Sequence, residues 1–387
     1  MEDEPGARSV HTLISRTVRF YDSQPERTDH LKTAAFQALT SELSKADDPR
    51  VHGELRLAVT HARELVSRSD DIQAADLMTW LGRFDYVHGA YNSAESLWRR
   101  EYESRRTILG LEHQSTLTSM NNLALTLGDQ GDLEGARKIQ EQVLEITRRV
   151  LGKEHPDTLT FMNNLAGTLG DQGDLKGARK IQEQVLEITR RVLGEEHPDT
   201  LASMNNLALT LGDQGDREGA RKIQEQVLEI RRRVLGEEHP DTLTSMHNLA
   251  ETLRAQGDLK GARKIHEQML EIRRRVLGEE HPDTLTSMNN LAETLKAQGD
   301  LKGARKIHEQ VLEIRRRVLG AEHPNTSGIA WNLFSTYLEA GNSDGAKTIF
   351  EDNLIWLLDR NPESLGAVQL QIRDMILQML QGADQPE

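Results

Sequence analysis

The chain has 387 residues, of which 36% are hydrophobic, 28% are charged and only 4% are aromatic. This composition is too apolar for a disordered chain and too poor in aromatic residues for one large globular core. The formal net charge of −14 argues against nucleic acid as a partner, because a phosphate backbone needs a basic surface. The chain contains no cysteine, which excludes disulfides and thiolate metal sites and suits a reducing compartment.

The amino terminus carries no recognisable targeting signal. Met1 to Pro5 is acidic, and no apolar stretch follows it. No segment approaches the roughly 20 apolar residues that a membrane-spanning helix needs. We therefore expect a soluble cytoplasmic protein with no membrane association.

Region 1–73 is expected to be helical, with segments near 8–21, 26–46 and 50–68, but it shows no internal repeat. It is interpreted either as an N-terminal cap or as the remnant of a preceding domain.

A repeat of 42 residues fills the chain from residue 74 onward. The block Met-Asn-Asn-Leu-Ala begins at Met120, Met162, Met204 and Met288, and Met246 opens a Met-His-Asn-Leu-Ala version. Such near-identity at a fixed spacing indicates duplication of one structural unit. The pattern predicts seven units across 74–362, at 74–115, 116–157, 158–199, 200–241, 242–283, 284–325 and 326–362.

Each unit is expected to form two helices joined by a tight turn. In 158–199, apolar residues recur three and four apart on a first helix, and Gly173 then interrupts the pattern with Asp174 placed to cap the second helix. The second helix is predicted over about 175–193, with Gly194 as its stop. Its expected apolar face consists of Ala178, Ile181, Val185, Ile188 and Val192, widened by Leu186 and Leu193.

The C-terminal region 363–387 is predicted to hold a capping helix and a tail. This helix, from about Pro362 to Leu380, is expected to close the open end of the array. Its inward side chains are predicted to be Leu365, Val368, Ile372, Ile376 and Leu380.

A single hairpin cannot bury both faces of its helices, so the units must stack on one another. The fold class is therefore all-α, a solenoid of stacked antiparallel helix pairs. Met162, Leu165, Ala166, Leu169, Gly173, Leu175, Ala178 and Val185 fall on the signature positions of the tetratricopeptide repeat. Together with the LGxEHPDT joint, the unit resembles the longer variety found in kinesin light chains and many bacterial proteins. The resemblance implies a right-handed superhelix whose first helices line a concave groove.

A second resemblance concerns the first hundred residues. Ser9 to Ile14, followed by Val18 and Arg19, resembles the end of the winged-helix region in bacterial NB-ARC (STAND) ATPases. In those proteins a tetratricopeptide array is the C-terminal sensor. The chain has no G-x-x-x-x-G-K-[ST] loop, so the ATPase itself is absent. The resemblance implies a regulatory sensor module that works with a separate NB-ARC-type ATPase.

Two neighbouring columns on the first helix of each unit are rich in asparagine. The groove column consists of Asn121, Asn163, Asn205, His247, Asn289 and Trp331. In this repeat class that position points into the groove, where side-chain amides can hold an extended peptide. The alternative is that these amides bond neighbouring helices and space the repeats. That spacing role is favoured for the adjacent column, Asn122, Asn164, Asn206, Asn248, Asn290 and Asn332.

Charge changes along the first helices. Asp129, Asp171 and Asp213 lie near their ends in the early units, whereas Arg254 and Lys296 lie there in later ones. The groove is therefore expected to run from acidic to mixed charge, which would orient a partner. The alternative is an ordinary solvated face.

The remaining periodic residues are given structural roles. A histidine recurs in the joint of each unit, and members one repeat apart are too widely spaced to share a metal ion. The arginine runs at 231–233, 273–275 and 315–317 are interpreted as solvated helix ends. The histidines are His113, His155, His197, His239, His281 and His323.

No asymmetric set of catalytic side chains is present, so we expect no enzymatic activity, no cofactor and no metal. The leading hypothesis is a scaffold that binds an extended or helical segment of another protein in its groove. Self-association through the stack ends, or through aromatic residues such as Trp80 and Trp331, is the structural alternative.

Overall fold

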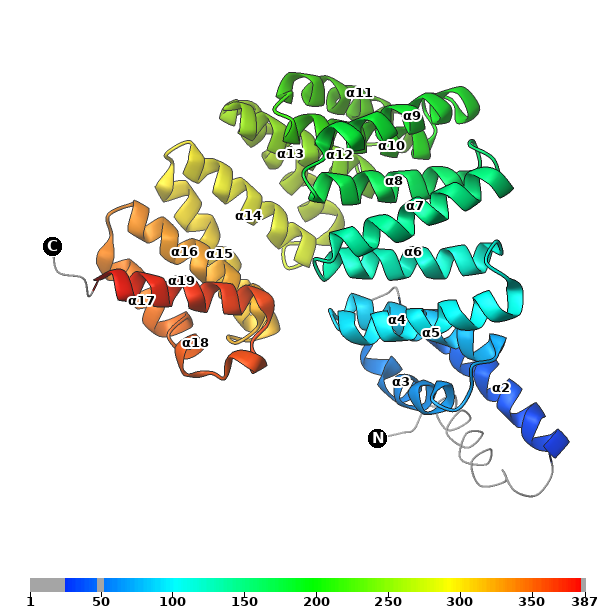
Figure 1. Ribbon diagram of the computed structural model, residues 1–387. Helices are drawn as coiled ribbons and strands as arrows, with labels where there is room; N and C mark the ends of the chain where they lie inside the picture. Colours follow the sequence, from blue (N-terminus) through cyan, green and yellow to red (C-terminus); the bar gives the residue numbers. More distant parts are fainter. Residues whose placement is uncertain (1–24, 47–51, 384–387) are drawn as a thin grey trace. The chain divides into compact units, whose positions relative to one another are not determined.

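The computed structural model describes residues 25–46 and 52–383, and every regular element in these ranges is a helix (Figure 1). The predicted all-α fold class is confirmed. The chain forms two compact units, Met1–Gly194 and Glu195–Glu387, and each is described by itself. None of the helices in the described ranges combines the length and apolar character that a membrane span requires.

The first unit contains two leading helices and three hairpins. Its helices are α2 (Pro25–Leu43), α3 (His52–Val66), α4 (Ile72–Val87), α5 (Tyr91–Leu109), α6 (Gln114–Asp129), α7 (Leu133–Val150), α8 (Pro156–Asp171) and α9 (Leu175–Leu193).

The second unit contains four hairpins and a closing helix. Its helices are α10 (Pro198–Asp213), α11 (Arg217–Leu235), α12 (Pro240–Gln256), α13 (Leu259–Leu277), α14 (Pro282–Ala297), α15 (Leu301–Leu319), α16 (Pro324–Glu339), α17 (Ser343–Asn353), α18 (Trp356–Asp359), the 3₁₀ turn η2 (Pro362–Ser364) and α19 (Ala367–Ala383).

The hairpins stack in sequence order. We name the first helix of each hairpin (α4 to α16, even numbers) an A helix and the second (α5 to α17, odd numbers) a B helix. Within each unit every A helix packs on its own B helix, and that B helix packs on the next A helix. The expected stack of helix pairs is therefore confirmed, and buried leucines, methionines and alanines from successive hairpins form its core.

The turn inside each hairpin is built as the sequence predicts. Gly173 has φ of +84°, a conformation that favours glycine, and the Asp174 side chain accepts the backbone N–H of Gly177 at 2.9 Å. A Cβ on Gly177 would lie 2.5 Å from Oδ2 of Asp174, so the cap requires glycine there.

The joint histidines cap the A helices. Nδ1 of His155, for example, accepts the backbone N–H of Asp157 at 3.2 Å, and Pro156 occupies the first helical position. The predicted structural turn role of this column is confirmed, and the A helices α6 to α16 begin directly after their histidine, at a proline or, in α6, at Gln114. The first A helix, α4, begins at Ile72 and is capped by Asp71 instead.

The leading helices α2 and α3 pack on α4. Phe36, Leu39, Leu55, Leu77 and Met78 are fully buried in one cluster there. The predicted segments 26–46 and 50–68 are therefore helical in their described parts. The segment 8–21, and the motif that resembles NB-ARC proteins, lie outside the described residues.

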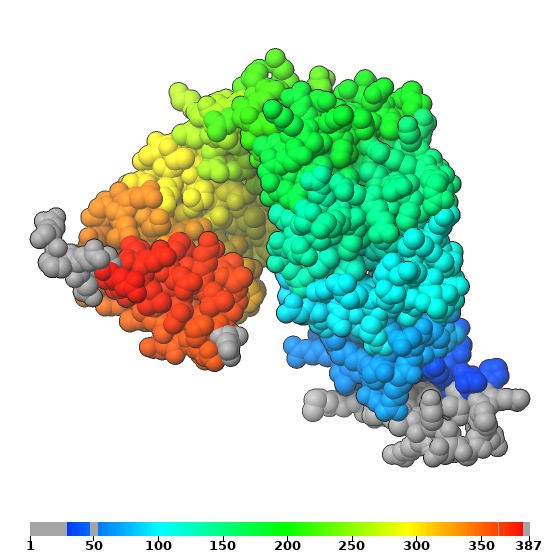
Figure 2. Space-filling model, viewed as in Figure 1, coloured from blue at the N-terminus to red at the C-terminus, as the bar shows by residue number. Residues whose placement is uncertain are grey.

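The second helix of the last hairpin departs from the prediction. It is not a continuous 19-residue B helix, because α17 ends at Asn353 and the short α18 follows. The break turns Leu354 and Leu357 inward, where both are fully buried against Ile372 and Ile376 of α19. The capping role of α19 is thereby explained, and Figure 2 shows α19 (red) lying over the last hairpin (orange).

Two predicted apolar faces are only partly correct. Val368 and Leu380 of α19 are each 48% exposed rather than inward. Val192 at the end of α9 is 49% exposed, and Leu193 is 39% exposed.

Candidate partner-binding face

The A helices present one open face along each unit. Buried positions such as Met162, Leu165 and Ala166 alternate at helical spacing with accessible ones such as Asn163 and Gly167. The groove column and the charged residues near the helix ends all lie on accessible positions of this face, except Asn121, which is only 8% exposed. We call this surface the A face.

The two asparagine columns are joined by side-chain hydrogen bonds between successive A helices. Nδ2 of Asn164 donates to Oδ1 of Asn121 at 2.8 Å. The same bond recurs from Asn248 to Asn205 at 2.9 Å, and from Asn332 to Asn289 at 2.9 Å. The spacing role predicted for the second column is confirmed, and the first column shares it.

These bonds occupy the acceptor of three groove-column amides. Oδ1 of Asn121, Asn205 and Asn289 is occupied, whereas no acceptor within the described residues takes their Nδ2 hydrogens. Oδ1 of Asn163 is buried and has no partner in the described residues. Of the two expected contacts to a peptide, the three bonded asparagines keep only the donating one. A side-chain amide whose oxygen is held in place offers a fixed pair of N–H donors.

Two members of the groove column are not asparagine. His247 keeps a polar contact to the next helix, with its Nδ1 3.4 Å from Nδ2 of Asn290. Trp331 is half-buried and packs on Phe334 with ring centroids 5.3 Å apart. Trp80 is likewise half-buried against the core around α4. Trp80 and Trp331 are therefore only partly accessible, and self-association through them stays a prediction.

The charged residues of the A face follow the predicted change of sign. Asp171 and Asp213 are exposed, and Asp129 accepts a hydrogen bond from the hydroxyl of Tyr86 at 2.5 Å. That bond and burial raise the pKa of Tyr86 to about 12. Arg254 and Lys296 occupy the register position of Gly212, one residue before that of Asp213.

The later cations are paired within the chain. Arg254 contacts Glu251 at 2.7 Å, and Lys296 contacts Glu339 at 2.8 Å while donating to Ser335 at 2.9 Å. The equivalent position is uncharged in the earlier repeats, at Leu125 and Gly167 of the first unit and Leu209 of the second, whereas Glu251 and Glu293 place carboxylates there.

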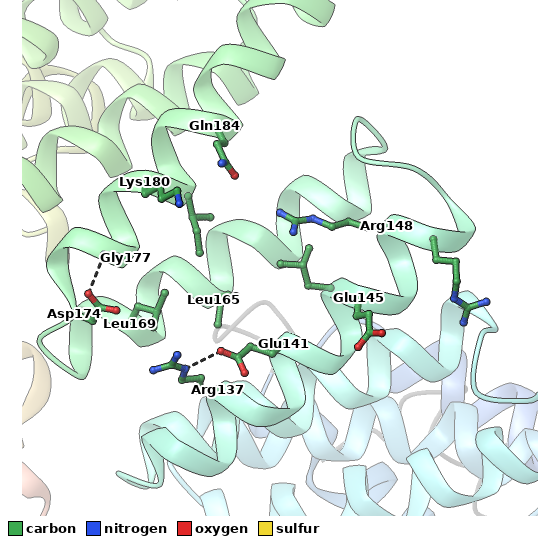
Figure 3. Close-up of a pocket in the computed structure, with 13 residues that line it drawn as sticks. Arg137, Glu141, Glu145, Arg148, Leu165, Leu169, Asp174, Gly177, Lys180 and Gln184 are labelled. Atoms are coloured by element: carbon green, nitrogen blue, oxygen red, sulfur yellow. Dashed lines mark hydrogen bonds and ion pairs between the residues drawn. The ribbon is translucent and has the colours of Figure 1, made fainter.

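The B helices lie farther apart than the A helices. In the first unit α6 contacts α8 directly, whereas a cavity of about 800 Å³ separates α7 from α9 (Figure 3). Leu165 and Leu169 of α8 form its floor, and Arg137 on its rim is paired with Glu141 at 2.8 Å. Because the A helices pack more closely, the A face is the inner side of this unit.

The arginine runs are not simply solvated helix ends, as predicted from the sequence. Arg231 is 9% exposed, and its Nη1 donates to Oγ of Ser245 at 2.8 Å and to the carbonyl of Asp241 at 2.9 Å. Arg273 makes the same two bonds to the following A helix. These first arginines face inward because they lie one helical turn after the buried Val227 and Met269.

The last arginine of each run is exposed and reaches back across its own hairpin. Arg191 contacts Glu154 at 2.8 Å, and Arg233 contacts Glu196 at 2.8 Å. Exposed pairs of this kind contribute little to stability, so they serve mainly to orient the joints.

A buried ion pair distinguishes the first hairpin. Glu101 is 0% exposed and lies 3.3 Å from Arg105, and it accepts hydrogen bonds from Thr79 and Ser119 at 2.8 Å each. Burial raises the pKa of the Glu101 carboxyl, while Arg105 opposes that rise. The equivalent residues of the next two repeats are valine and threonine, so this pair is a local feature.

Two buried histidines form a polar feature of the B helices that was not predicted from the sequence. His266 and His308 replace the glutamines found at the same B-helix position in earlier repeats, and both are at most 1% exposed. Burial lowers the pKa of each to about 4. The signal available in the sequence was that only unit 242–283 carries histidine both here and, as His247, in the groove column.

Comparisons with known proteins agree with the repeat register. Two family models described as "Tetratricopeptide repeat" match the chain, one at 116–157 and the other at 157–232, 205–275, 247–317 and 283–352. A search among curated proteins gives no match.

Several solved structures resemble the chain. A putative kinesin light chain from Podosopora anserina, with nearly identical TPR-like repeats, is 34% identical over 53% of this chain and 98% of that chain, with a TM-score of 0.49. BtubC (BKLC) from P. vanneervenii is 23% identical over 60% of this chain and 93% of that chain, with a TM-score of 0.51. The apo form of the quorum sensor NprR from B. thuringiensis is 10% identical over 89% of this chain and 97% of that chain, with a TM-score of 0.59. The last two likenesses concern the fold alone.

Proposed function

Since the chain belongs to the tetratricopeptide-repeat family, we propose that it is a scaffold that binds an extended segment of a partner protein along its A face. The observation that carries this proposal is the set of oriented amide donors in the groove column. The oxygens of Asn205 and Asn289 are occupied by the next repeat, so rotation of these two amides is restricted while their N–H groups stay available.

Such donors suit a peptide backbone. Successive repeats stack at about 10 Å, the distance between packed helices, and an extended chain covers about 10 Å in three residues. Each amide of the column can therefore donate to every third carbonyl of a bound segment without reading its side chains. Asn205 and Asn289 of the second unit are the main contributors, because both oxygens are held by the next repeat and both residues lie at accessible positions.

The surroundings of the column favour the same seat. In the second unit Leu209 is uncharged and 47% exposed, one helical turn after Asn205. An uncharged position beside a fixed donor accommodates a backbone and small apolar side chains. The exposed Asp213 would select for a basic residue at that end of the segment.

Replacing Asn205 and Asn289 together with aspartate is expected to weaken peptide binding at least about fivefold, since each lost hydrogen bond contributes about 0.5–1.5 kcal/mol. Aspartate still accepts from the next repeat but cannot donate, so folding is retained. The probe is a peptide selected from a random displayed library on the immobilised full chain, and its affinity is measured by fluorescence anisotropy.

The matched control is Gln310→Glu, which makes the same chemical change at an exposed position of a B helix. Leu209→Glu, which places on this face the carboxylate that later repeats carry at the equivalent position, is a second test and should also weaken binding. Affinity that is unchanged in both the double variant and Leu209→Glu would place the binding surface elsewhere.

A further inference from the structure

His266 carries a buried nitrogen with no hydrogen-bond partner in the described residues. Its Nδ1 lies 2.9 Å from Oγ1 of Thr294, and that hydroxyl donates its single hydrogen to the carbonyl of Asn290 at 3.0 Å. The hydroxyl must therefore accept from Nδ1–H, which fixes the tautomer and leaves a lone pair on Nε2. This Nε2 is buried and bonded to nothing in the described chain.

The group that faces this lone pair is a carboxylate. Oε1 of Glu251 lies 3.8 Å from Nε2 of His266, which is too long for a hydrogen bond and brings two acceptors toward each other. Arg254 holds the other oxygen, Oε2, through its Nε at 3.0 Å and its Nη2 at 2.7 Å. The carboxylate is therefore oriented with Oε1 available on the histidine side.

His247 supplies a third donor beside these two. It stands one helical turn before Glu251 on α12, and its ring centroid lies 6.3 Å from that of His266 on α13. One ligand atom from each of His247, Glu251 and His266 lies within 4.8 Å of the other two. In the described residues this is the one such group of three or more.

We propose that His247, Glu251 and His266 bind a divalent transition-metal ion, such as Zn²⁺, with a remaining position open to water or to a ligand atom from a partner. Two imidazoles and one carboxylate suit zinc, nickel or copper rather than magnesium or calcium. Ligand atoms around a tetrahedral Zn²⁺ stand about 3.4 Å apart at bond lengths of about 2.0–2.1 Å. Movements of about 1 Å by the half-buried His247 and Glu251 close the site around the fixed His266.

The hydrogen bond from His266 to Thr294 is the outer contact that metal-bound histidines ordinarily make, because it orients the ring. The guanidinium of Arg254 is the positive charge nearest the site, and it is paired with Glu251 and 45% exposed. Arg254 holds the Glu251 carboxylate in place, and because Arg254 is exposed, water screens its positive charge.

The next repeat provides an internal comparison. His308 and Glu293 repeat the same pair, with Nε2 to Oε1 at 3.4 Å and Nδ1 to Thr336 at 3.2 Å. Asn289 replaces the groove-column histidine there, so only two ligands remain. The site is therefore specific to unit 242–283.

The test is isothermal titration of the full chain, free of any polyhistidine tag, with ZnCl₂. One ion is expected per chain, and His247→Asn or His266→Gln should weaken its binding at least about tenfold. Both substitutions place the residue that other repeats carry at these positions, so folding is preserved. Cobalt substitution provides a second readout, since its visible absorption should appear in the parent chain and vanish in both variants.

Two further variants distinguish this site from general binding by surface histidines. His308→Gln should leave zinc binding unchanged, and Asn289→His should add a second ion by completing the triad of the next repeat. Zinc binding that is equal in the parent chain, His247→Asn and His266→Gln, or no zinc binding by the parent chain, would overturn the proposal.

Discussion

Replacing Arg105 with alanine is expected to lower the free energy of unfolding by about 3–5 kcal/mol, because a buried charge would lose its partner. Arg105 is 8% exposed on its side chain and lies between Glu101 and Asp76, at 3.3 and 3.0 Å. Glu101 has no route to solvent, and Thr79 and Ser119 alone cannot neutralise it. Urea unfolding followed by circular dichroism measures the loss.

The loss should depend on pH in a defined direction. The pKa of the Glu101 carboxyl is already raised by burial, and it rises further without Arg105. Because the folded pKa lies above the unfolded one, the destabilisation is present at neutral pH and shrinks as the pH falls toward the unfolded glutamate pKa. Destabilisation that is equal at neutral and acidic pH would contradict a charge-based origin.

The double variant Glu101→Val with Arg105→Thr is the matched control. It installs Val143 and Thr147, the pair of the next repeat, at these positions. Replacing a buried ion pair by well-packed apolar residues is often neutral or stabilising, so the double variant should recover most of the lost stability. Ser119 and Thr79 keep backbone acceptors, at 2.9 Å and 3.2 Å.

Replacing Ile372 and Ile376 of α19 with alanine is expected to cost about 4 kcal/mol or more, since buried isoleucine-to-alanine changes cost about 2–5 kcal/mol each. Both side chains are at most 3% exposed and cover Leu354 and Leu357. Because each repeat is stabilised mainly by its neighbours, the last hairpin should unfold before the rest. Hydrogen exchange should show protection lost first in α16 and α17.

The control uses the other two apolar residues of the same helix. Val368 and Leu380 are each 48% exposed, so alanine at both should change stability by no more than about 0.5 kcal/mol each. If this exposed pair proved as costly as the buried pair, the packing of α19 would be wrong.

The sequence predicted the hairpin architecture because its signals are local and repeated. Gly173 and Asp174 specify a turn and a cap whatever lies around them, and the joint histidine precedes a proline that can only start a helix. Even the end of the array was predicted in outline, since α19 begins close to the expected position.

Features that depend on the neighbouring repeat were missed. Nothing local distinguishes the inward Arg231 from the exposed Arg233, because their difference arises from the carbonyl and hydroxyl that the next A helix supplies. The exposure of Val192 was missed as well, since periodicity alone does not say how far along a helix its apolar face stays covered. The break after α17 likewise follows from α19 and not from a proline or glycine.

The hydrogen bonds of the groove column were not predicted. Most of the column lies at accessible positions of the A helices, but the oxygens of Asn121, Asn205 and Asn289 are engaged by the second asparagine column. That engagement involves residues 43 positions apart, which no single repeat reveals. Likewise, the proximity of His247 to His266 needs the packing of α12 on α13.

The central claim is that the groove column donates to the backbone of a bound segment. A double-mutant cycle tests it most directly, by pairing Asn205→Asp with a selected peptide in which one amide bond is replaced by an ester, whose carbonyl is a weaker acceptor. The ester is moved along the peptide one position at a time. Backbone recognition predicts a coupling free energy of about 0.5–1.5 kcal/mol between Asn205→Asp and the ester at one peptide position. Asn289 lies two repeats after Asn205, so Asn289→Asp should show an equal coupling with an ester about six residues away along the peptide. Additive losses at every ester position would contradict it.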